Sequence, residues 1–85
     1  LLGPEKSINL TLRSQKTELV LEVTLGVKLW QLANLYKKNR ALHEFNHVEL
    51  YLDSTSPALD KNATLKDLGI ETDVTLIVKE RSIGA

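Results

Sequence analysis

Alternation of apolar and polar residues runs through the first third of the chain. The apolar positions of this pattern are Ile8, Leu10, Leu12, Leu19, Leu21 and Val23. A period of two residues is that of a half-buried β-strand, and the polar residues 13–16 separate the two runs. The pattern therefore predicts an antiparallel hairpin over residues 7–24.

The period changes at about Gly26. Apolar residues then recur at i, i+3, i+4 and i+7, namely Leu29, Leu32, Ala33 and Tyr36. This spacing places them on one face of an amphipathic helix. The basic pair at 37–38 suits the negative end of a helix. We expect one helix that covers the apolar face of the hairpin.

Two more strands are predicted in the second half of the chain. Their apolar positions are Val48, Leu50 and Leu52 in the third strand and Val74, Leu76 and Val78 in the last. Leu59 lies between them, and we expect it to form a very short strand of its own. We also expect Leu21, Leu32, Leu50 and Leu76 to be buried.

The stretch NATLKDLGI, residues 62–70, predicts a short helical turn before the last strand. Thr64 and Asp67 are three residues apart, the spacing at which side chains cap the backbone amides of a helix start. Leu65, Leu68 and Ile70 can all reach a core only if the backbone coils tightly. The turn is thus expected to close the open end of the core.

The element order favours a two-layer α+β domain, with one helix across a mixed sheet of four to five strands. We expect residues 7–80 to form this domain and residues 1–6 and 81–85 to be flexible tails. A length of 85 residues fits a single domain, and the 42% apolar share allows one core.

Charge and composition exclude several classes of function. Eleven basic and eleven acidic residues balance to zero, so no long-range field favours a nucleic acid or an anionic membrane. The absence of cysteine excludes disulfides, thiolate zinc sites and cysteine nucleophiles. No apolar run approaches the roughly 20 residues of a membrane span. We expect an intracellular domain of the cytoplasm or nucleus.

The motifs and their order resemble the β-grasp fold of ubiquitin and its relatives. TELVLEV (17–23) resembles the second strand of that fold, TLKDLGI (64–70) its capped turn, and VTLIV (74–78) its last strand. The spacing of Leu29, Leu32 and Tyr36 and the phrase DLGIE (67–71) are similar to SUMO and to SUMO-like domains embedded in scaffold proteins. The resemblance covers residues 7–80.

This resemblance implies a non-catalytic protein-interaction module of a larger protein. Its partners would be proteins, such as ubiquitin or SUMO conjugating machinery or ubiquitin receptors, and it would need no cofactor and be a monomer as an isolated domain. The alternative is a covalent modifier. That role requires a tail ending in Gly-Gly, whereas the matching positions here are Gly84 and Ala85, so conjugation is disfavoured.

Ubiquitin's partners mostly contact an apolar patch on its exposed sheet face. The matching residues here are Tyr51, Ile77 and Lys79. We expect Tyr51 and Ile77 to lie in solvent as neighbours, since exposed aromatic and aliphatic groups side by side can mark an interface. Isolated apolar residues on a protein surface are also common, and this remains the alternative interpretation.

SUMO relatives instead receive an extended peptide in a groove beside the second strand and the helix. The matching residues are Val20, Leu21, Glu22, Val23, Leu32 and Tyr36. Glu22 and Thr24 stand where relatives have basic residues, which argues against an acidic peptide. Some embedded SUMO-like domains dock on a SUMO-conjugating enzyme through acidic residues, matched here by Asp53, Glu71 and Asp73. A solvated acidic rim is the alternative for these three.

Three further residues have no assigned chemistry. Trp30 lies at the edge of the helical stripe, where it either seals the core or anchors a contact. His43 and His47 are four residues apart, but no third metal ligand is near them. We find no phosphate-binding loop, nucleophile motif or paired carboxylates and expect no enzymatic activity.

Overall fold

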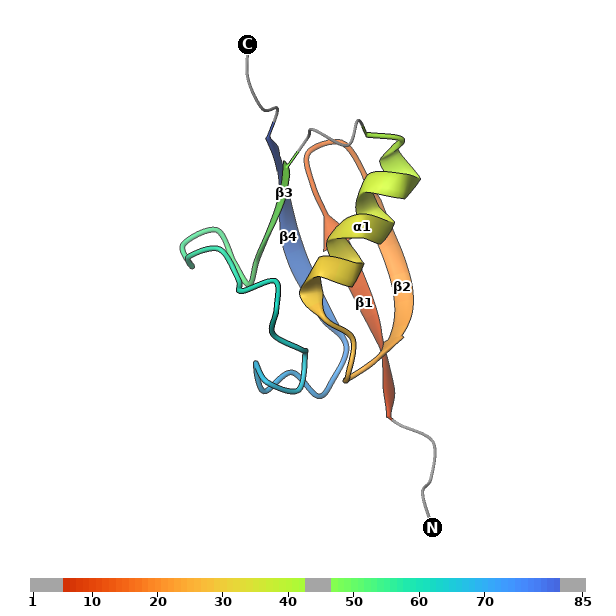
Figure 1. The fold of residues 1–85 in the computed structure, drawn as a ribbon, viewed down its shortest axis with the longest axis vertical. Helices are drawn as coiled ribbons and strands as arrows, with labels where there is room; N and C mark the ends of the chain where they lie inside the picture. The colour runs from red at the N-terminus through yellow and green to blue at the C-terminus, as the bar shows by residue number, and fades with distance from the viewer. Residues whose placement is uncertain (1–5, 43–46, 82–85) are drawn as a thin grey trace.

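In the computed structural model, residues 6–42 and 47–81 are described. The elements are β1 (Ser7–Arg13), β2 (Glu18–Thr24), α1 (Leu29–Arg40), β3 (His47–Tyr51) and β4 (Val74–Arg81). The strands form one sheet in the order β2-β1-β4-β3, and α1 crosses one of its faces (Figure 1). β1 and β4 are parallel, while the other two pairs are antiparallel. The predicted mixed sheet and single helix are confirmed.

The two predicted tails differ from the structure in one respect. Arg81 belongs to β4 rather than to a tail. Residues 1–5 and 82–85, which include Gly84 and Ala85, lie outside the described residues.

The hairpin has the predicted boundaries. Its register runs from Ser7 opposite Thr24 to Arg13 opposite Glu18. The turn is held by Ser14, whose Oγ accepts hydrogen bonds from the backbone N–H groups of Lys16 and Thr17, both at 3.1 Å. A serine hydroxyl that bonds to the backbone in this way stabilises a tight turn.

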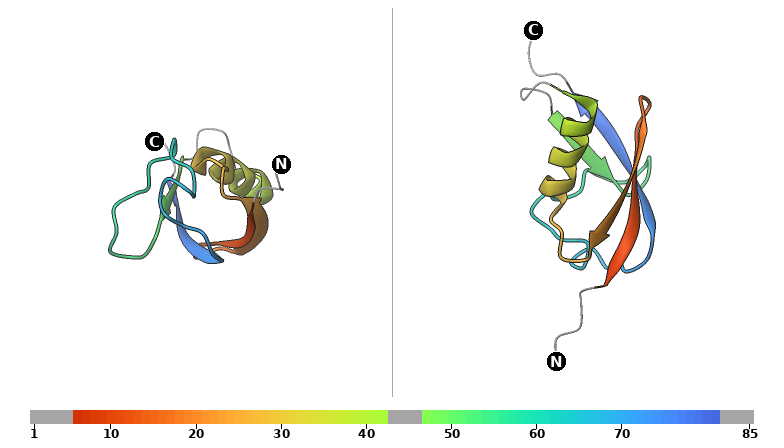
Figure 2. Two further views of the ribbon diagram at one scale, coloured as in Figure 1. Left: turned by 90° about the horizontal axis from the view of Figure 1, so that it is seen from below. Right: turned by 90° about the vertical axis from the view of Figure 1, so that its right-hand side faces the viewer.

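The core lies between α1 and one face of the sheet, and Figure 2 shows these two layers from below and from the side. Its buried residues are Ile8, Leu10, Leu12, Leu29, Leu32, Ala33, Tyr36, Val48, Leu50, Leu65, Leu76 and Val78. The predicted burial of Leu32, Leu50 and Leu76 is confirmed. Leu21 is only half-buried, because β2 is an edge strand that neighbouring strands cover on one side only.

Both ends of α1 have identifiable partners for their free backbone groups. The helix begins at Leu29, the first residue of the predicted stripe, and the Lys28 N–H donates to Gln31 Oε1 at 3.0 Å. The Leu29 and Trp30 N–H groups donate to the carbonyls of Ala63 and Lys61, at 3.1 and 3.0 Å. At the other end Ala41 adopts the left-handed conformation, with φ 55°.

The segment 64–70 is a capped turn rather than a helix. The Thr64 N–H donates to Asp67 Oδ2 and the Asp67 N–H donates to Thr64 Oγ1, each at 3.0 Å. Gly69 has φ 74°, and the Ile70 N–H closes the turn on the Leu65 carbonyl at 3.0 Å. Leu65 is fully buried, as expected of a residue that closes the core.

The predicted short strand at Leu59 is wrong. Within the described residues the sheet has four strands, and Leu59 makes one hydrogen bond to its edge, from its N–H to the Leu50 carbonyl at 2.8 Å. One such bond satisfies part of the exposed edge of β3 without extending the sheet.

Candidate functional site

The first candidate surface is the sheet-face site, which we define as Tyr51, Ile77 and Lys79. Tyr51 of β3 lies directly opposite Ile77 of β4 in the sheet register, on the face that points away from α1. The Lys79 Nζ lies 4.8 Å from the centroid of the Tyr51 ring, within the range of a cation–π interaction. The predicted proximity of Tyr51 and Ile77 is therefore confirmed.

The expectation that these two side chains lie in solvent holds only in part. Tyr51 and Ile77 are both half-buried. The aliphatic stem and ammonium of Lys79 cover part of the Tyr51 ring. A partner would therefore meet an ordered aromatic–cation pair rather than a freely solvated tyrosine.

The sheet-face site continues as a row across all four strands. Arg13 of β1 is the register partner of Ile77 and also of Glu18 in β2. The Arg13 Nε donates to Glu18 Oε2 at 2.8 Å. A hollow of about 290 Å³ lies beside this row and is lined by Arg13, Ser14, Gln15, Ile77, Val78 and Lys79. From β2 to β3, the side chains of this row change from charged (Glu18 and Arg13) to apolar and aromatic (Ile77 and Tyr51).

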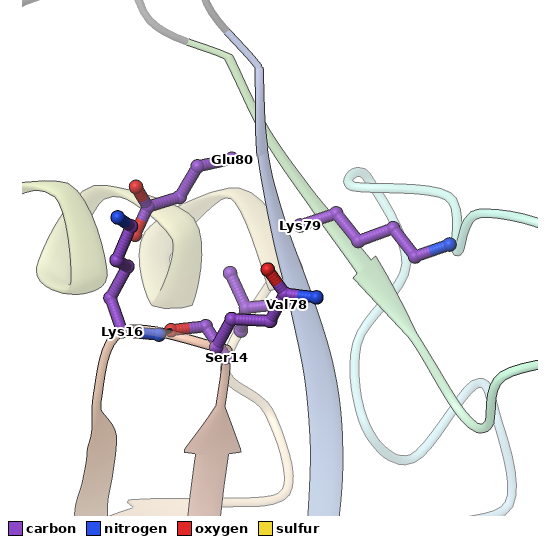
Figure 3. A pocket seen from close by; sticks show the side chains of 6 residues that line it. Ser14, Lys16, Val78, Lys79 and Glu80 are labelled. Atoms are coloured by element: carbon purple, nitrogen blue, oxygen red, sulfur yellow. Dashed lines mark hydrogen bonds between the residues drawn. The ribbon is translucent and has the colours of Figure 1, made fainter.

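A second hollow, of about 200 Å³, lies between the hairpin turn and β4 (Figure 3). Its lining residues are Ser14, Gln15, Lys16, Val78, Lys79 and Glu80. The Lys79 side chain extends to the opposite side of β4 from Lys16 and Glu80. Since the two lysines point apart, they do not form a common anion site.

A polar network beside this hollow joins the hairpin turn, α1 and β4. The Tyr36 hydroxyl bonds to Ser14 Oγ at 2.7 Å and to Glu80 Oε2, and the Arg40 Nε donates to Glu80 Oε2 at 2.9 Å. Burial and the bond to Glu80 raise the pKa of Tyr36. The Arg40 hydrogen bond lowers the pKa of Glu80 despite partial burial.

The second candidate surface is the β2–α1 groove, with a volume of about 260 Å³. Its lining residues are Leu19, Leu21, Leu35, Lys38 and Asn39. Leu35 is 44% exposed. β2 is also an edge strand, so its outer backbone edge has no neighbouring strand within the described part of the chain.

Most of the residues predicted for this groove lie elsewhere. Leu32 and Tyr36 are 0% exposed and belong to the core, so a partner cannot reach them. Val20 and Glu22 are exposed on the opposite face of the sheet, since successive strand residues point to opposite sides. Val23 is half-buried on the helix side of β2.

The α1 residues Leu35 and Lys38 line this groove but were not predicted for it. Both lie outside the buried stripe of α1, to which the two predicted helix residues, Leu32 and Tyr36, belong. Only Leu21 is common to the predicted and observed linings. Leu35 lies on the flank of α1 that faces β2. A helical wheel, combined with the order of the strands, would therefore have predicted Leu35 as a groove residue.

The three acidic residues of the predicted rim have separate local surroundings. Asp53 Oδ1 accepts hydrogen bonds from Thr55 and Ser56, which lower the pKa of Asp53. Asp73 Oδ1 accepts from the Asn9 N–H at 2.9 Å. Glu71 lines a hollow of about 320 Å³ whose other residues are Lys6, Leu25, Gly26 and Lys66.

The described residues contain no group of three or more His, Asp or Glu side chains placed to hold a metal ion, and His43 lies outside them. Every buried side-chain nitrogen or oxygen in residues 6–42 and 47–81 has a hydrogen-bond partner. None of their helices has the length and apolarity needed to cross a bilayer.

No protein-family model and no curated protein matches the chain, but solved structures do. One, described as molecular mimicry of SUMO that promotes DNA repair, has a TM-score of 0.73 and 22% identity, with 91% of this chain and 95% of that chain covered. The ubiquitin of Caldiarchaeum subterraneum has a TM-score of 0.76 at 17% identity, with 93% and 99% covered.

A third structure is the N-terminal ubiquitin-like domain in the 4931431F19Rik protein. Its TM-score is 0.75 at 14% identity, and the match covers 96% of this chain and 82% of that chain. TM-scores of 0.73, 0.76 and 0.75 indicate that all three have the fold of this chain. The chain has the ubiquitin-like β-grasp fold.

Proposed function

We propose that this chain is a non-catalytic, ubiquitin-like protein-interaction module of a larger protein and acts in ubiquitin or SUMO pathways. The proposal is carried by the direct pairing of Tyr51 with Ile77 on the sheet face that α1 leaves open, with Lys79 over the Tyr51 ring. Groups held on neighbouring strands are already ordered, so less conformational entropy is lost when they bind.

The chemistry of the sheet-face site defines the partner it suits. Tyr51 and Ile77 offer a small apolar contact, and Lys79 offers positive charge at its margin, whereas Arg13 is paired with Glu18. A partner with an aliphatic anchor and a nearby carboxylate would complement both features. Conjugating machinery or ubiquitin receptors would be partners of this kind, and the likeness to a SUMO mimic and to ubiquitin supports that direction.

The β2–α1 groove is a second candidate surface for the same function. The sequence suggested that Glu22 would disfavour an acidic peptide in this groove, but Glu22 lies on the opposite face of β2. Lys38 lines the groove instead. An extended acidic peptide would therefore meet a cation beside an apolar floor, and it could add to the edge of β2.

Chemical-shift mapping with the natural partner tests these surfaces. The partner is first identified by mass spectrometry after a pull-down with the parent protein. We expect Tyr51→Ala to weaken it at least about tenfold, because a buried tyrosine anchor can contribute about 2 kcal/mol. Leu35→Ala is the matched control and should change affinity little. Shifts confined to residues 19–21 and 35–39, with Tyr51 and Ile77 silent, would assign binding to the groove instead.

A further inference from the structure

One flank of α1 exposes an aromatic side chain beside positive charge. We define the Trp30 flank as Trp30, Asn34, Lys37 and Lys38. Trp30 is 43% exposed, and Asn34 and Lys38 are also exposed. Residues 29–40 include three basic residues and no acidic residue. The sheet-face site lies on the other side of the molecule, because Tyr51 and Ile77 point away from the face that α1 covers.

The helix sets the spacing of these groups. Trp30, Asn34 and Lys37 follow the i, i+4, i+7 rule, so they form a row along one side of α1. Trp30 and Lys37 are about 10 Å apart along the axis at 1.5 Å per residue. Leu35 lies about 140° around the helix from Trp30 at 100° per residue. Leu35, on the floor of the β2–α1 groove, therefore lies outside this row, whereas Lys38 lines the groove as well.

The Trp30 end of the row is firmly held. The Leu29 and Trp30 N–H groups donate to carbonyls of the segment 61–63, which passes beside the N-terminal half of α1 (Figure 1). Lys61 in that segment also pairs with Glu49 of β3, with 3.6 Å between Nζ and Oε1. An aromatic residue at a fixed backbone position can anchor a contact at low entropic cost.

The charges on the helix favour a negatively charged partner. Arg40 is neutralised by Glu80, whereas within residues 6–42 and 47–81 neither Lys37 nor Lys38 forms an ion pair. We propose that the Trp30 flank binds an acidic segment of a partner protein, with an apolar side chain on Trp30 and carboxylates at Lys37 and Lys38. Opposite charges at such a margin raise both association rate and specificity.

Trp30 is the single tryptophan of the chain, so its fluorescence reports on this flank alone. The probe is a synthetic 18-residue amphipathic peptide of leucine and glutamate, compared with a peptide in which glutamine replaces every glutamate. We expect the acidic peptide to shift Trp30 emission to the blue and to protect it from acrylamide quenching. The glutamine peptide should bind about tenfold more weakly, because it lacks the charge pairs.

A charge reversal on the row tests the same contact from the side of the protein. Asn34→Glu combined with Lys37→Glu should weaken the acidic peptide about tenfold or more by like-charge repulsion, while circular dichroism confirms that the variant is folded. Neither residue lines the β2–α1 groove. Tyr51→Ala should leave peptide affinity unchanged, which separates this proposal from the function proposed for the sheet face.

Three outcomes would overturn the proposal. Equal binding of the glutamine peptide would show that charge is not recognised. Loss of binding in Leu35→Ala but not in the charge-reversed variant would place the peptide in the β2–α1 groove. An equal blue shift with vesicles of phosphatidylserine and phosphatidylcholine, absent with the acidic peptide, would identify a lipid surface.

Discussion

Ala41 ends α1 in a conformation that usually belongs to glycine. Its φ is 55°, and the Leu42 N–H bonds to the Lys37 carbonyl at 2.9 Å across this turn. A side chain with a Cβ is strained in the left-handed region by about 1–2 kcal/mol. We expect Ala41→Gly to stabilise the protein by about 1 kcal/mol, measured by urea denaturation.

Gly69 provides the matched control for that prediction. Its φ is 74°, and a Cβ built there has no atom within 4 Å. Gly69→Ala should therefore be destabilising by about 1 kcal/mol through backbone strain alone. If Ala41→Gly were destabilising while Gly69→Ala was neutral, the left-handed conformations at these two positions would be wrong.

Glu80 gives a residue-scale prediction about pH. Its pKa is lowered below the ordinary value, first by the Arg40 hydrogen bond. A lowered pKa in the folded state means that this stabilisation is complete above about pH 5 and is lost as the pH falls through the lowered pKa. Glu80→Gln should thus destabilise the protein at neutral pH by about 1 kcal/mol, since charge-assisted hydrogen bonds are lost.

The same variant should lose its difference from the wild type in acid. Thermal melts between about pH 7 and 2 should show the two melting temperatures converging as Glu80 becomes protonated. Glu18→Gln is a suitable control, because Glu18 pairs with Arg13 on the surface, where ion pairs contribute little. A melting-temperature gap that stays constant with pH would contradict the role given to the Glu80 carboxylate.

At the scale of elements, the burial of Leu50 provides a test of the register of β3. Leu50 is fully buried in β3 and lies opposite Val78 of β4. Leu50→Ala should cost roughly 2–5 kcal/mol of unfolding free energy, the range for large-to-small core substitutions. Leu21→Ala should cost less, because that residue is half-buried in the edge strand. An unchanged melting temperature for Leu50→Ala would mean that β3 is shifted by one residue.

Periodicity predicted the elements well because each strand and the helix has one buried face. The alternation of Ile8, Leu10 and Leu12 and the stripe from Leu29 to Tyr36 both correspond to core residues. Leu59 was misassigned because a single apolar residue between turns carries no period. The position of the turn at 64–70 was predicted correctly from its capping pair, Thr64 and Asp67. The hydrophobic periodicity of this short segment could not show whether it is a turn or a short helix.

The predicted binding surfaces were less accurate, because they depend on how elements meet. Tyr36 was assigned to the groove, yet its hydroxyl bonds to Ser14 and Glu80 from distant parts of the chain. Glu22 was placed at the groove, although strand alternation turns it away. The contacts of Tyr36 do not follow from local sequence, since they require the packing of α1 on the sheet, whereas the orientation of Glu22 does follow from the alternation in β2.

At the scale of the whole molecule, a net charge of zero conceals a separation of charges. The helix α1 contains Lys37, Lys38 and Arg40 and no acidic residue, whereas the exposed residues of β2 include Glu18 and Glu22. The zero net charge predicts no strong long-range field. It does not show that the charges of α1 are all basic, which is the local feature that the proposal for the Trp30 flank uses.

The fold alone is compatible with both a binding module and a covalent modifier, since the ubiquitin of Caldiarchaeum subterraneum shares it. The difference between the two is chemical. A modifier needs a Gly-Gly tail to enter the activating enzyme without side-chain clash, and no two of the four glycines in these 85 residues are adjacent. We therefore expect no thioester when the chain is incubated with ATP and ubiquitin or SUMO activating enzymes.

SUMO itself serves as the positive control for that assay, and samples are compared with and without a reducing agent. Tyr51→Ala should leave this negative result unchanged, because the substitution does not create a Gly-Gly sequence. A higher-mass band that forms only with ATP and disappears on reduction would contradict the non-covalent role. Such a band would indicate covalent conjugation rather than binding through the sheet-face site.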